Sequence, residues 1–261
     1  MPRSRRRGND LFCFAASELS ADGVPSLSVP VRLNNLGARM IESKRFSDGI
    51  DAFKKSMSSL KSAIQQYAKC KKRTRQDSER KHVDASFEQT LSPEDLHRLS
   101  ELWNETDSSD QAQPELFLFQ FPLKISQDEL YFPESYTEIS IILTYNLALA
   151  YHLHAMSQDM LDVEKLHKAL DLYGMTLNLL LRDQSFKHNT VTCTTAILNN
   201  MGSLHYILGN QDFAKKFFNR MLSIIMIELA ANRKEELKVH LNGFFQNINR
   251  LLYEQPSAAA A

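Results

Sequence analysis

The sequence lacks the features that mark most enzymes, metal sites and secreted proteins. It has only three cysteines in 261 residues: Cys13, Cys70 and Cys193. They are odd in number, far apart and without metal-ligand spacing, which is typical of a reducing compartment rather than a disulfide scaffold. No glycine-rich phosphate loop, paired metal motif or glycine-flanked nucleophilic serine is present. We therefore expect no enzymatic activity, no cofactor and no bound metal.

Long apolar runs and an excess of charge are also missing. No apolar stretch approaches the roughly 20 residues that a membrane helix needs, and Lys plus Arg equal Asp plus Glu at 31 each. A net charge near zero gives no long-range attraction for nucleic acid or membrane. Arginines at residues 3–7 before the apolar residues 11–16 imitate a signal peptide, but the apolar stretch is short. We expect a cytoplasmic protein that does not contact a membrane; a nuclear location, or a transit peptide in this tail, is the alternative.

A short phrase containing asparagine recurs along the chain. Its copies are LNNLG at 33–37, YNLA at 145–148 and LNNMG at 198–202. Each copy is followed by a second apolar helical stretch. Recurring helix pairs are typical of a stacked helical repeat rather than of a closed globule.

The residues at fixed positions around each phrase carry a family resemblance. The first copy has large, small and aromatic residues at Leu33, Leu36, Gly37, Met40, Phe46, Gly49, Phe53 and Ser56. The second has Leu147, Ala148, Tyr151, Leu166, Ala169, Tyr173 and Leu177, and the third has Leu198, Met201, Gly202, His205, Gly209, Ala214, Phe218 and Leu222. This pattern resembles the 34-residue tetratricopeptide (TPR) unit, with an insertion in the second copy. The resemblance implies an all-α protein, a right-handed α–α superhelix; an irregular helical bundle is the alternative.

Composition divides the chain into seven parts. They are a basic tail at 1–28, a first helix pair at 29–68, a polar, partly disordered insertion at 69–114, a strand-like segment at 115–135, second and third helix pairs at 136–233, a capping helix at 234–254 and a tail at 255–261. The insertion is too polar to offset its ordering entropy, although a short helix is predicted at 93–103. Because the strand-like segment is rich in aromatic residues, we expect a small β-strand element there, covering a helix edge or pairing with residues 11–14.

The TPR resemblance also implies a peptide-binding groove. In that family, asparagines at the sixth position of successive repeats hold an extended peptide, and here Asn35, Asn146 and Asn200 occupy this position. A carboxamide offers both a donor and an acceptor, so it can bind a peptide group without reading side chains. Further groove candidates on the same helix faces are Asn34, Asn199, Leu149, His152, Ser203 and Tyr206. The alternative is that these asparagines bond neighbouring helices or loop carbonyls of the chain itself.

These observations predict a non-catalytic scaffold or adaptor that binds an extended peptide or partner helix, as a monomer or weak homo-oligomer. The partner is not predicted, but the groove positions carry no Lys or Arg, which argues against binding of a carboxylate tail. A nuclear or RNA-associated protein using basic segments 3–7 and 69–75 is the alternative. His152 and His154 are two residues apart on a helix, so they point to different faces and are poor metal co-ligands. Cys193 is expected to be a buried, inert thiol.

Overall fold

The computed structural model describes residues 26–74, 116–126, 135–157, 161–182, 190–231 and 240–253, and most of these residues are helical. The helices are α1 (Ser28–Glu42), α2 (Phe46–Thr74), α4 (Ser135–Met156), α5 (Val163–Arg182), α6 (Thr190–Ile207), α7 (Gln211–Ala230) and α9 (Leu241–Tyr253). The predicted predominance of helix is therefore confirmed. Helix α2 continues to Thr74, past the boundary predicted at residue 68.

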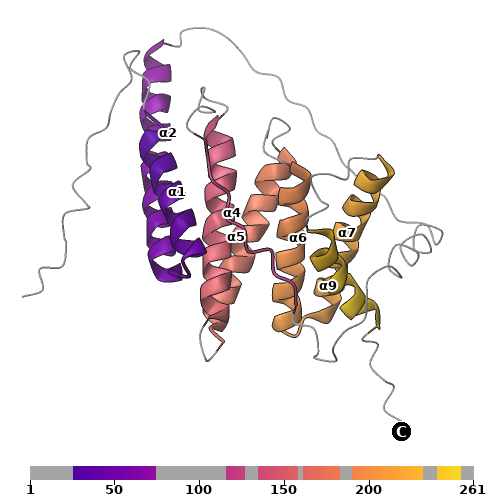
Figure 1. The fold of residues 1–261 in the computed structure, drawn as a ribbon. Helices are drawn as coiled ribbons and strands as arrows, with labels where there is room; N and C mark the ends of the chain where they lie inside the picture. The colour runs from indigo at the N-terminus through magenta and orange to yellow at the C-terminus, as the bar shows by residue number, and fades with distance from the viewer. Residues whose placement is uncertain are drawn as a thin grey trace, which may run out of the picture.

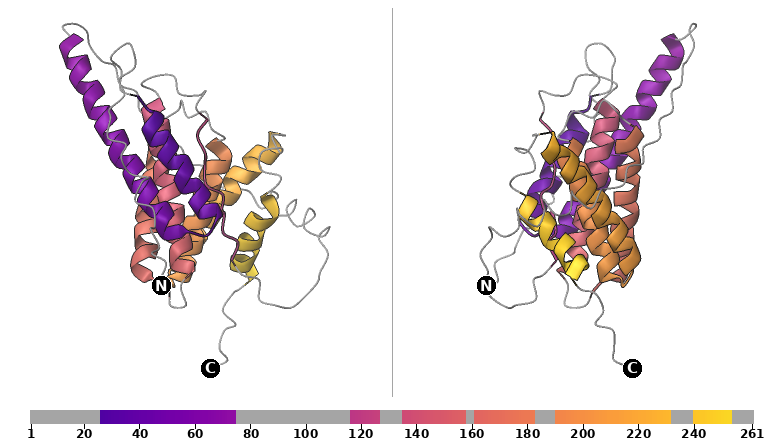
Figure 2. Two further views of the ribbon diagram at one scale, coloured as in Figure 1. Left: turned by 60° about the vertical axis from the view of Figure 1, so that its left-hand side comes forward. Right: turned by 90° about the vertical axis from the view of Figure 1, so that its right-hand side faces the viewer.

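The helices pack as neighbouring pairs arranged side by side in a row (Figure 1). Helix α1 packs on α2, α4 on α5 and α6 on α7, while α9 contacts α7 and α6. Short turns at residues 43–45 and 208–210 make the first and third pairs antiparallel hairpins. The rotated views in Figure 2 show the long α2 projecting beyond its neighbours at one end of the row.

The first and third pairs are held by the same close approach between a glycine and a phenylalanine ring. A Cβ on Gly37 would lie 2.6 Å from the Phe53 ring, and one on Gly202 would lie 2.7 Å from the Phe218 ring. These separations are too short for a real Cβ. In both pairs the phenylalanine follows its glycine by 16 positions and is buried. The small residue therefore sets the distance between the two helices of each pair.

The turns of these two hairpins are also equivalent. Lys44 and Gly209, each seven positions after its glycine, have φ angles of 58° and 77°. In both turns the next amide bonds back to a helix carbonyl, Arg45 N–H to Met40 and Asn210 N–H to His205, each at 2.8 Å. A residue with a left-handed backbone conformation commonly ends a helix, and it is usually glycine. In the first pair this residue is Lys44 instead.

Helix α4 lies between the first and third pairs and is the most apolar element. Tyr136–Met156 is long and apolar enough to cross a membrane by length and composition, with mean hydropathy 1.2. The sequence prediction that no such stretch exists is therefore wrong. However, 78% of this apolar stretch of α4 is buried inside the fold, because α4 packs on α5, α2 and α1. Its apolar character follows from having neighbours on several sides.

Residues 116–126, which we call the extended segment, cross the row of helices without forming a strand. In Figure 1 the segment passes in front of α4 and runs on to α6. No strand occurs in the described ranges, so the predicted β-strand element is not found there. The reason is that the segment's peptide groups bond to side chains rather than to another strand. The predicted pairing with residues 11–14 and the predicted helix at 93–103 lie outside the described residues.

Candidate functional site

Four asparagines, one each from α1, α4, α6 and α9, bind the backbone of the extended segment; we call them the asparagine row. Each accepts the N–H and donates to the C=O of one and the same residue. The N–H and C=O distances are 2.9 and 2.7 Å for Asn35 on Ile125, 2.8 and 2.7 Å for Asn146 on Leu123, 3.0 and 3.0 Å for Asn200 on Phe119, and 2.8 and 2.7 Å for Asn247 on Phe117. The row thus makes eight hydrogen bonds to main-chain atoms.

The bound residues all have odd numbers because the segment is extended. In an extended chain the N–H and C=O of one residue point to the same edge, and this edge recurs every second residue. A row of carboxamides facing one edge therefore meets residues 117, 119, 123 and 125. The segment runs antiparallel to the helix order, since Phe117 lies at α9 and Ile125 lies at α1.

A second set of side chains, each directly before a row asparagine in the sequence, donates to a carbonyl of the segment. This carbonyl belongs to the residue two positions before the one that the row asparagine binds. Asn34 donates to the Leu123 carbonyl at 3.1 Å, and Asn199 donates to the Phe117 carbonyl at 3.0 Å. In the same position on α4, the Tyr145 hydroxyl donates to the Phe121 carbonyl at 3.3 Å. Helices α1, α4 and α6 therefore each contact the segment with two adjacent residues.

The asparagines also bond to one another, and they do so twice in the same way. Asn146 donates to the Oδ1 of Asn34, and Asn247 donates to the Oδ1 of Asn199, both at 2.8 Å. We call Asn34, Asn35 and Asn146 the first clamp, and Asn199, Asn200 and Asn247 the second clamp. The first holds Leu123 and Ile125 and the second holds Phe117 and Phe119. All of these asparagines except the half-buried Asn35 are fully buried.

Phe121 lies between the clamps, and no asparagine of the described residues binds it. The packing of the helices explains this gap. Two residues of an extended chain advance about 7 Å and four advance about 13 Å. The two-residue steps join α1 to α4 and α6 to α9, which pack on each other, whereas the four-residue step joins α4 to α6, which are less closely packed.

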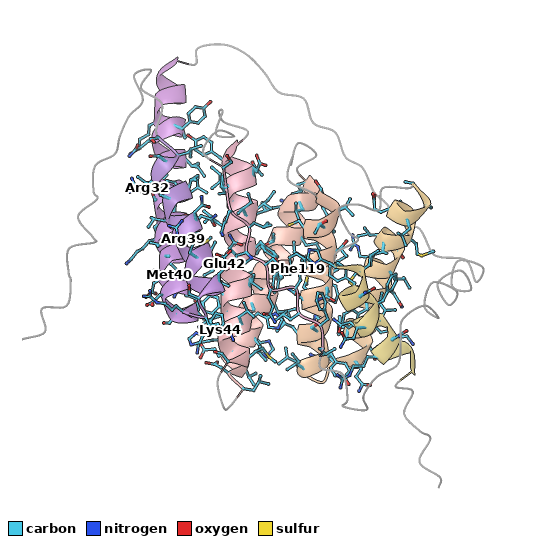
Figure 3. The ribbon with its side chains drawn as sticks, viewed as in Figure 1. Arg32, Arg39, Met40, Glu42, Lys44 and Phe119 are labelled. Atoms are coloured by element: carbon cyan, nitrogen blue, oxygen red, sulfur yellow. The ribbon has the colours of Figure 1, made fainter. Side chains whose placement is uncertain are left out.

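Apolar side chains of the segment add burial to the backbone contacts. Phe119, labelled in Figure 3 where the segment reaches α6, and Ile125 are each 4% exposed. Phe117 packs against α9, its ring centroid 5.6 Å from that of Phe244. Lys124 faces outward and forms an ion pair with Glu42 at 2.7 Å; Figure 3 shows Glu42 at the end of α1. The contact is therefore mostly apolar and main-chain in character.

The five asparagines predicted from the sequence all contact the segment, but the other predicted groove residues contribute less. Ser203 is buried and accepts from Asn247 at 3.2 Å. His152 is 1% exposed, its ring lies edge-on to Tyr173, and burial lowers its pKa from 6.5 to about 3. Tyr206 is half-buried with the Arg250 guanidinium over its ring, and Leu149 is fully buried. His152 and Leu149 are thus core residues rather than groove surface.

Sequence reasoning missed Asn247 and Tyr145. In the three recognised copies a small residue follows the row asparagine by two positions, as in Gly37, Ala148 and Gly202. At the same distance after Asn247 the chain has Asn249, so the fourth copy lacks this signal. The occupant of the row was also not foreseen. The alternative interpretation, bonding to carbonyls of the chain itself, describes what the asparagines do in this structure.

Outside the asparagine row, the described residues include one buried cysteine and several histidines. Cys193 is buried, as expected, and burial raises the pKa of its thiol to about 12. Among the residues that the structure covers, no group of three or more His, Cys, Asp or Glu side chains is placed to hold a metal. Basic residues 3–7 lie outside the described ranges, and the run at 69–75 lies mostly in the last turns of α2.

Comparison with family models, with curated proteins and with solved structures finds no match. The geometry of the row and its occupant therefore gives the best indication of what the chain binds.

Proposed function

We propose that this protein is a non-catalytic interaction scaffold, a TPR-like superhelix whose asparagine row binds an extended peptide through its backbone. The observation that carries the proposal is the repeated two-point contact, in which four carboxamides each bind both polar groups of one residue. Such contacts recognise the extended backbone of a peptide and the spacing of its N–H and C=O groups, and they do not depend on charged side chains. In this structure the chain's own extended segment occupies the row, and an outside peptide competes with it.

The energetics of the segment support exchange with an outside peptide. The eleven hydrogen bonds described for the segment, eight to the asparagine row and three to Asn34, Asn199 and Tyr145, contribute about 11 kcal/mol at about 1 kcal/mol each. Two buried and two half-buried apolar side chains add about 6 kcal/mol. Ordering the backbone of residues 117–125 costs about 14 kcal/mol at about 1.5 kcal/mol per residue, and fixing the four apolar side chains costs about 3 kcal/mol more. The near balance means that tethering, rather than intrinsic affinity, keeps the segment in place.

The side chains of the segment indicate what a competing peptide looks like. Phe117, Phe119, Leu123 and Ile125 alternate with Leu118, Gln120 and Lys124, of which the last two are exposed. We therefore expect partners to present an unstructured stretch with aromatic or aliphatic residues at alternate positions and without a Pro at a clamped residue, because Pro has no N–H.

The test uses the full chain with a vacated row. Phe117, Phe119, Leu123 and Ile125 are each changed to Ser, and a fluorescent peptide with the sequence of residues 114–127 is titrated by anisotropy. Binding to the vacated chain, with much weaker binding to the unaltered chain, is the expected result. If the vacated chain is unfolded alone, peptide-dependent recovery of its circular dichroism is the equivalent readout.

Two N-methylated peptides give a matched control for backbone recognition. Methylation of the amides at 119 and 123 removes N–H groups that the row accepts, and binding is expected to be lost. Methylation at 118 and 124 removes N–H groups on the opposite edge, and binding is expected to persist. Equal loss with both peptides, or no binding of the parent peptide in either readout, contradicts the proposal.

A further inference from the structure

We infer that the second clamp is an exchangeable site for a peptide of another protein with the pattern aromatic-x-aromatic, while the first clamp retains the chain's own segment. This inference rests on the proposed function. Exchange is thereby assigned to the second clamp alone, and that clamp is given a preference for aromatic side chains.

The second clamp has a seat built for an aromatic side chain at its first position. Phe117 lies directly on the backbone of α9 at Gly243, where an added Cβ would come within 2.3 Å of the ring. Its ring also meets Phe244 edge-on with centroids 5.6 Å apart. Any side chain at residue 243 would fill this seat, so the glycine is what admits an aromatic ring.

A second aromatic site follows two residues later. Phe119 is 4% exposed, with its ring stacked on Phe244 at 6.1 Å and edge-on to His240 at 4.7 Å. Burial lowers the pKa of His240, which favours the neutral imidazole beside these rings. Aromatic pairs of this kind add to the energy of area burial. The second clamp thus matches two aromatic residues spaced by one, held by backbone bonds at both.

The chain between the clamps is suited to act as a hinge. Gln120 is exposed and Phe121 is 56% exposed. The Phe121 ring contacts Phe119 and His240 on the second-clamp side, with centroids 5.2 and 5.1 Å apart. Pro122 has no N–H to donate. Among the described residues, one hydrogen bond holds residues 120–122: the Tyr145 hydroxyl donates to the Phe121 carbonyl at 3.3 Å. The half of the segment on the second clamp, together with the Phe121 ring, can therefore leave while residues 123–125 stay on the first clamp.

The two ends of the segment are tethered very differently. Eight residues, 127–134, separate the first-clamp end from the start of α4 at Ser135, whereas residues 75–115 separate the second-clamp end from α2. A short tether gives a high effective concentration, which falls steeply with tether length. The Lys124–Glu42 ion pair also lies on the first-clamp side. Exchange is therefore expected to begin at Phe117.

The experiment uses three full-length chains: the unaltered chain, the variant Phe117→Ala with Phe119→Ala, and the matched variant Leu123→Ala with Ile125→Ala. A fluorescent eight-residue peptide covering 114–121 is titrated against each. Binding to the first variant is expected to be at least about tenfold tighter than to the other two, because only there is the second clamp empty. Adding Gly243→Ala to the first variant is expected to abolish binding by filling the aromatic seat.

Hydrogen exchange of the unaltered chain provides a second readout that needs no variant. Amides at 117 and 119 are expected to exchange faster than those at 123 and 125, and faster still when the peptide is added. Slower exchange at 117 and 119, or equal peptide binding to all three chains, overturns the inference. If the 14-residue peptide of the previous section binds a vacated row but the eight-residue peptide does not, the proposed function stands and the inference fails. Concentration-dependent dimers that protect 117 and 119 would make a second copy the occupant and also overturn it.

Discussion

Replacing Asn146 with Ala is the sharpest test of the contacts that hold the extended segment. The side chain is fully buried, and it makes three hydrogen bonds. It accepts from the Leu123 N–H at 2.8 Å, donates to the Leu123 carbonyl at 2.7 Å and donates to Asn34 Oδ1 at 2.8 Å. After truncation the carbonyl keeps its bond from the Asn34 amide, whereas the N–H and Asn34 Oδ1 lose the partners described.

The expected magnitude follows from these two orphaned groups. A buried group left without a partner costs about 1–3 kcal/mol, which gives about 2–6 kcal/mol for the pair. The upper end is not reached, because the first-clamp half of the segment can detach and expose both groups to water. We therefore expect the free energy of unfolding to fall by about 2–4 kcal/mol, measured by urea denaturation followed by circular dichroism.

Thr144→Val on the same helix is the matched control. Thr144 is 3% exposed, and its hydroxyl donates to the Ser140 carbonyl within α4, so its loss should cost no more than about 1 kcal/mol. Hydrogen exchange at 123 and 125 should rise in Asn146→Ala and not in the control. A change under about 0.5 kcal/mol in Asn146→Ala, with protection of these amides unaltered, would refute the assignment of the row as what holds the segment.

Three further predictions concern the helix pairs and the core. Gly202→Ala should lower the free energy of unfolding by about 1–3 kcal/mol in urea, because its Cβ would lie 2.7 Å from the Phe218 ring; an unchanged midpoint would contradict the close approach. Lys44→Gly should raise stability by about 0.5–1 kcal/mol by relieving a left-handed φ of 58°, and Gly209→Ala should lower it, whereas opposite signs would exclude equivalent turns. Burial lowers the pKa of His152 from 6.5 to about 3, so stability is complete above pH 6.5 and falls by about 1.4 kcal/mol per pH unit as the pH drops from 6.5 toward 3. His152→Leu should flatten that slope between pH 7 and 5, and an identical slope would show that other groups cause it.

The helical architecture was predictable because it depends on local patterns. Apolar and small residues at helical spacing mark the faces that pack, and glycines such as Gly37 and Gly202 mark where two helices come closest. Lys44 in the equivalent turn position could not be anticipated, because its left-handed conformation is imposed by the hairpin on either side and has no sequence signal.

The occupant of the asparagine row was not predictable for a different reason. Its contacts join residues far apart in the chain, with 130 positions between Phe117 and Asn247 and 90 between Ile125 and Asn35. They involve backbone groups that every residue except proline possesses. The aromatic-rich pattern of residues 116–125 indicated an extended conformation, which the structure has, but a pattern of this kind does not distinguish pairing with a strand from pairing with carboxamides. The TPR resemblance itself stays a prediction.

The extended segment touches one helix from every pair and also α9, and this has a consequence for how the molecule comes apart. In a stack of helix pairs, each pair ordinarily contacts only its nearest neighbours, so the stack unfolds in stages from its ends. A cross-brace that bonds α1, α4, α6 and α9 adds coupling between helices at opposite ends of the row, such as α1 and α9 (Figure 1). Such a stack unfolds as a single cooperative unit while the extended segment is bound to the asparagine row. It unfolds stepwise when the segment has left the row. Occupancy of the row can then be measured from the steepness of the unfolding transition.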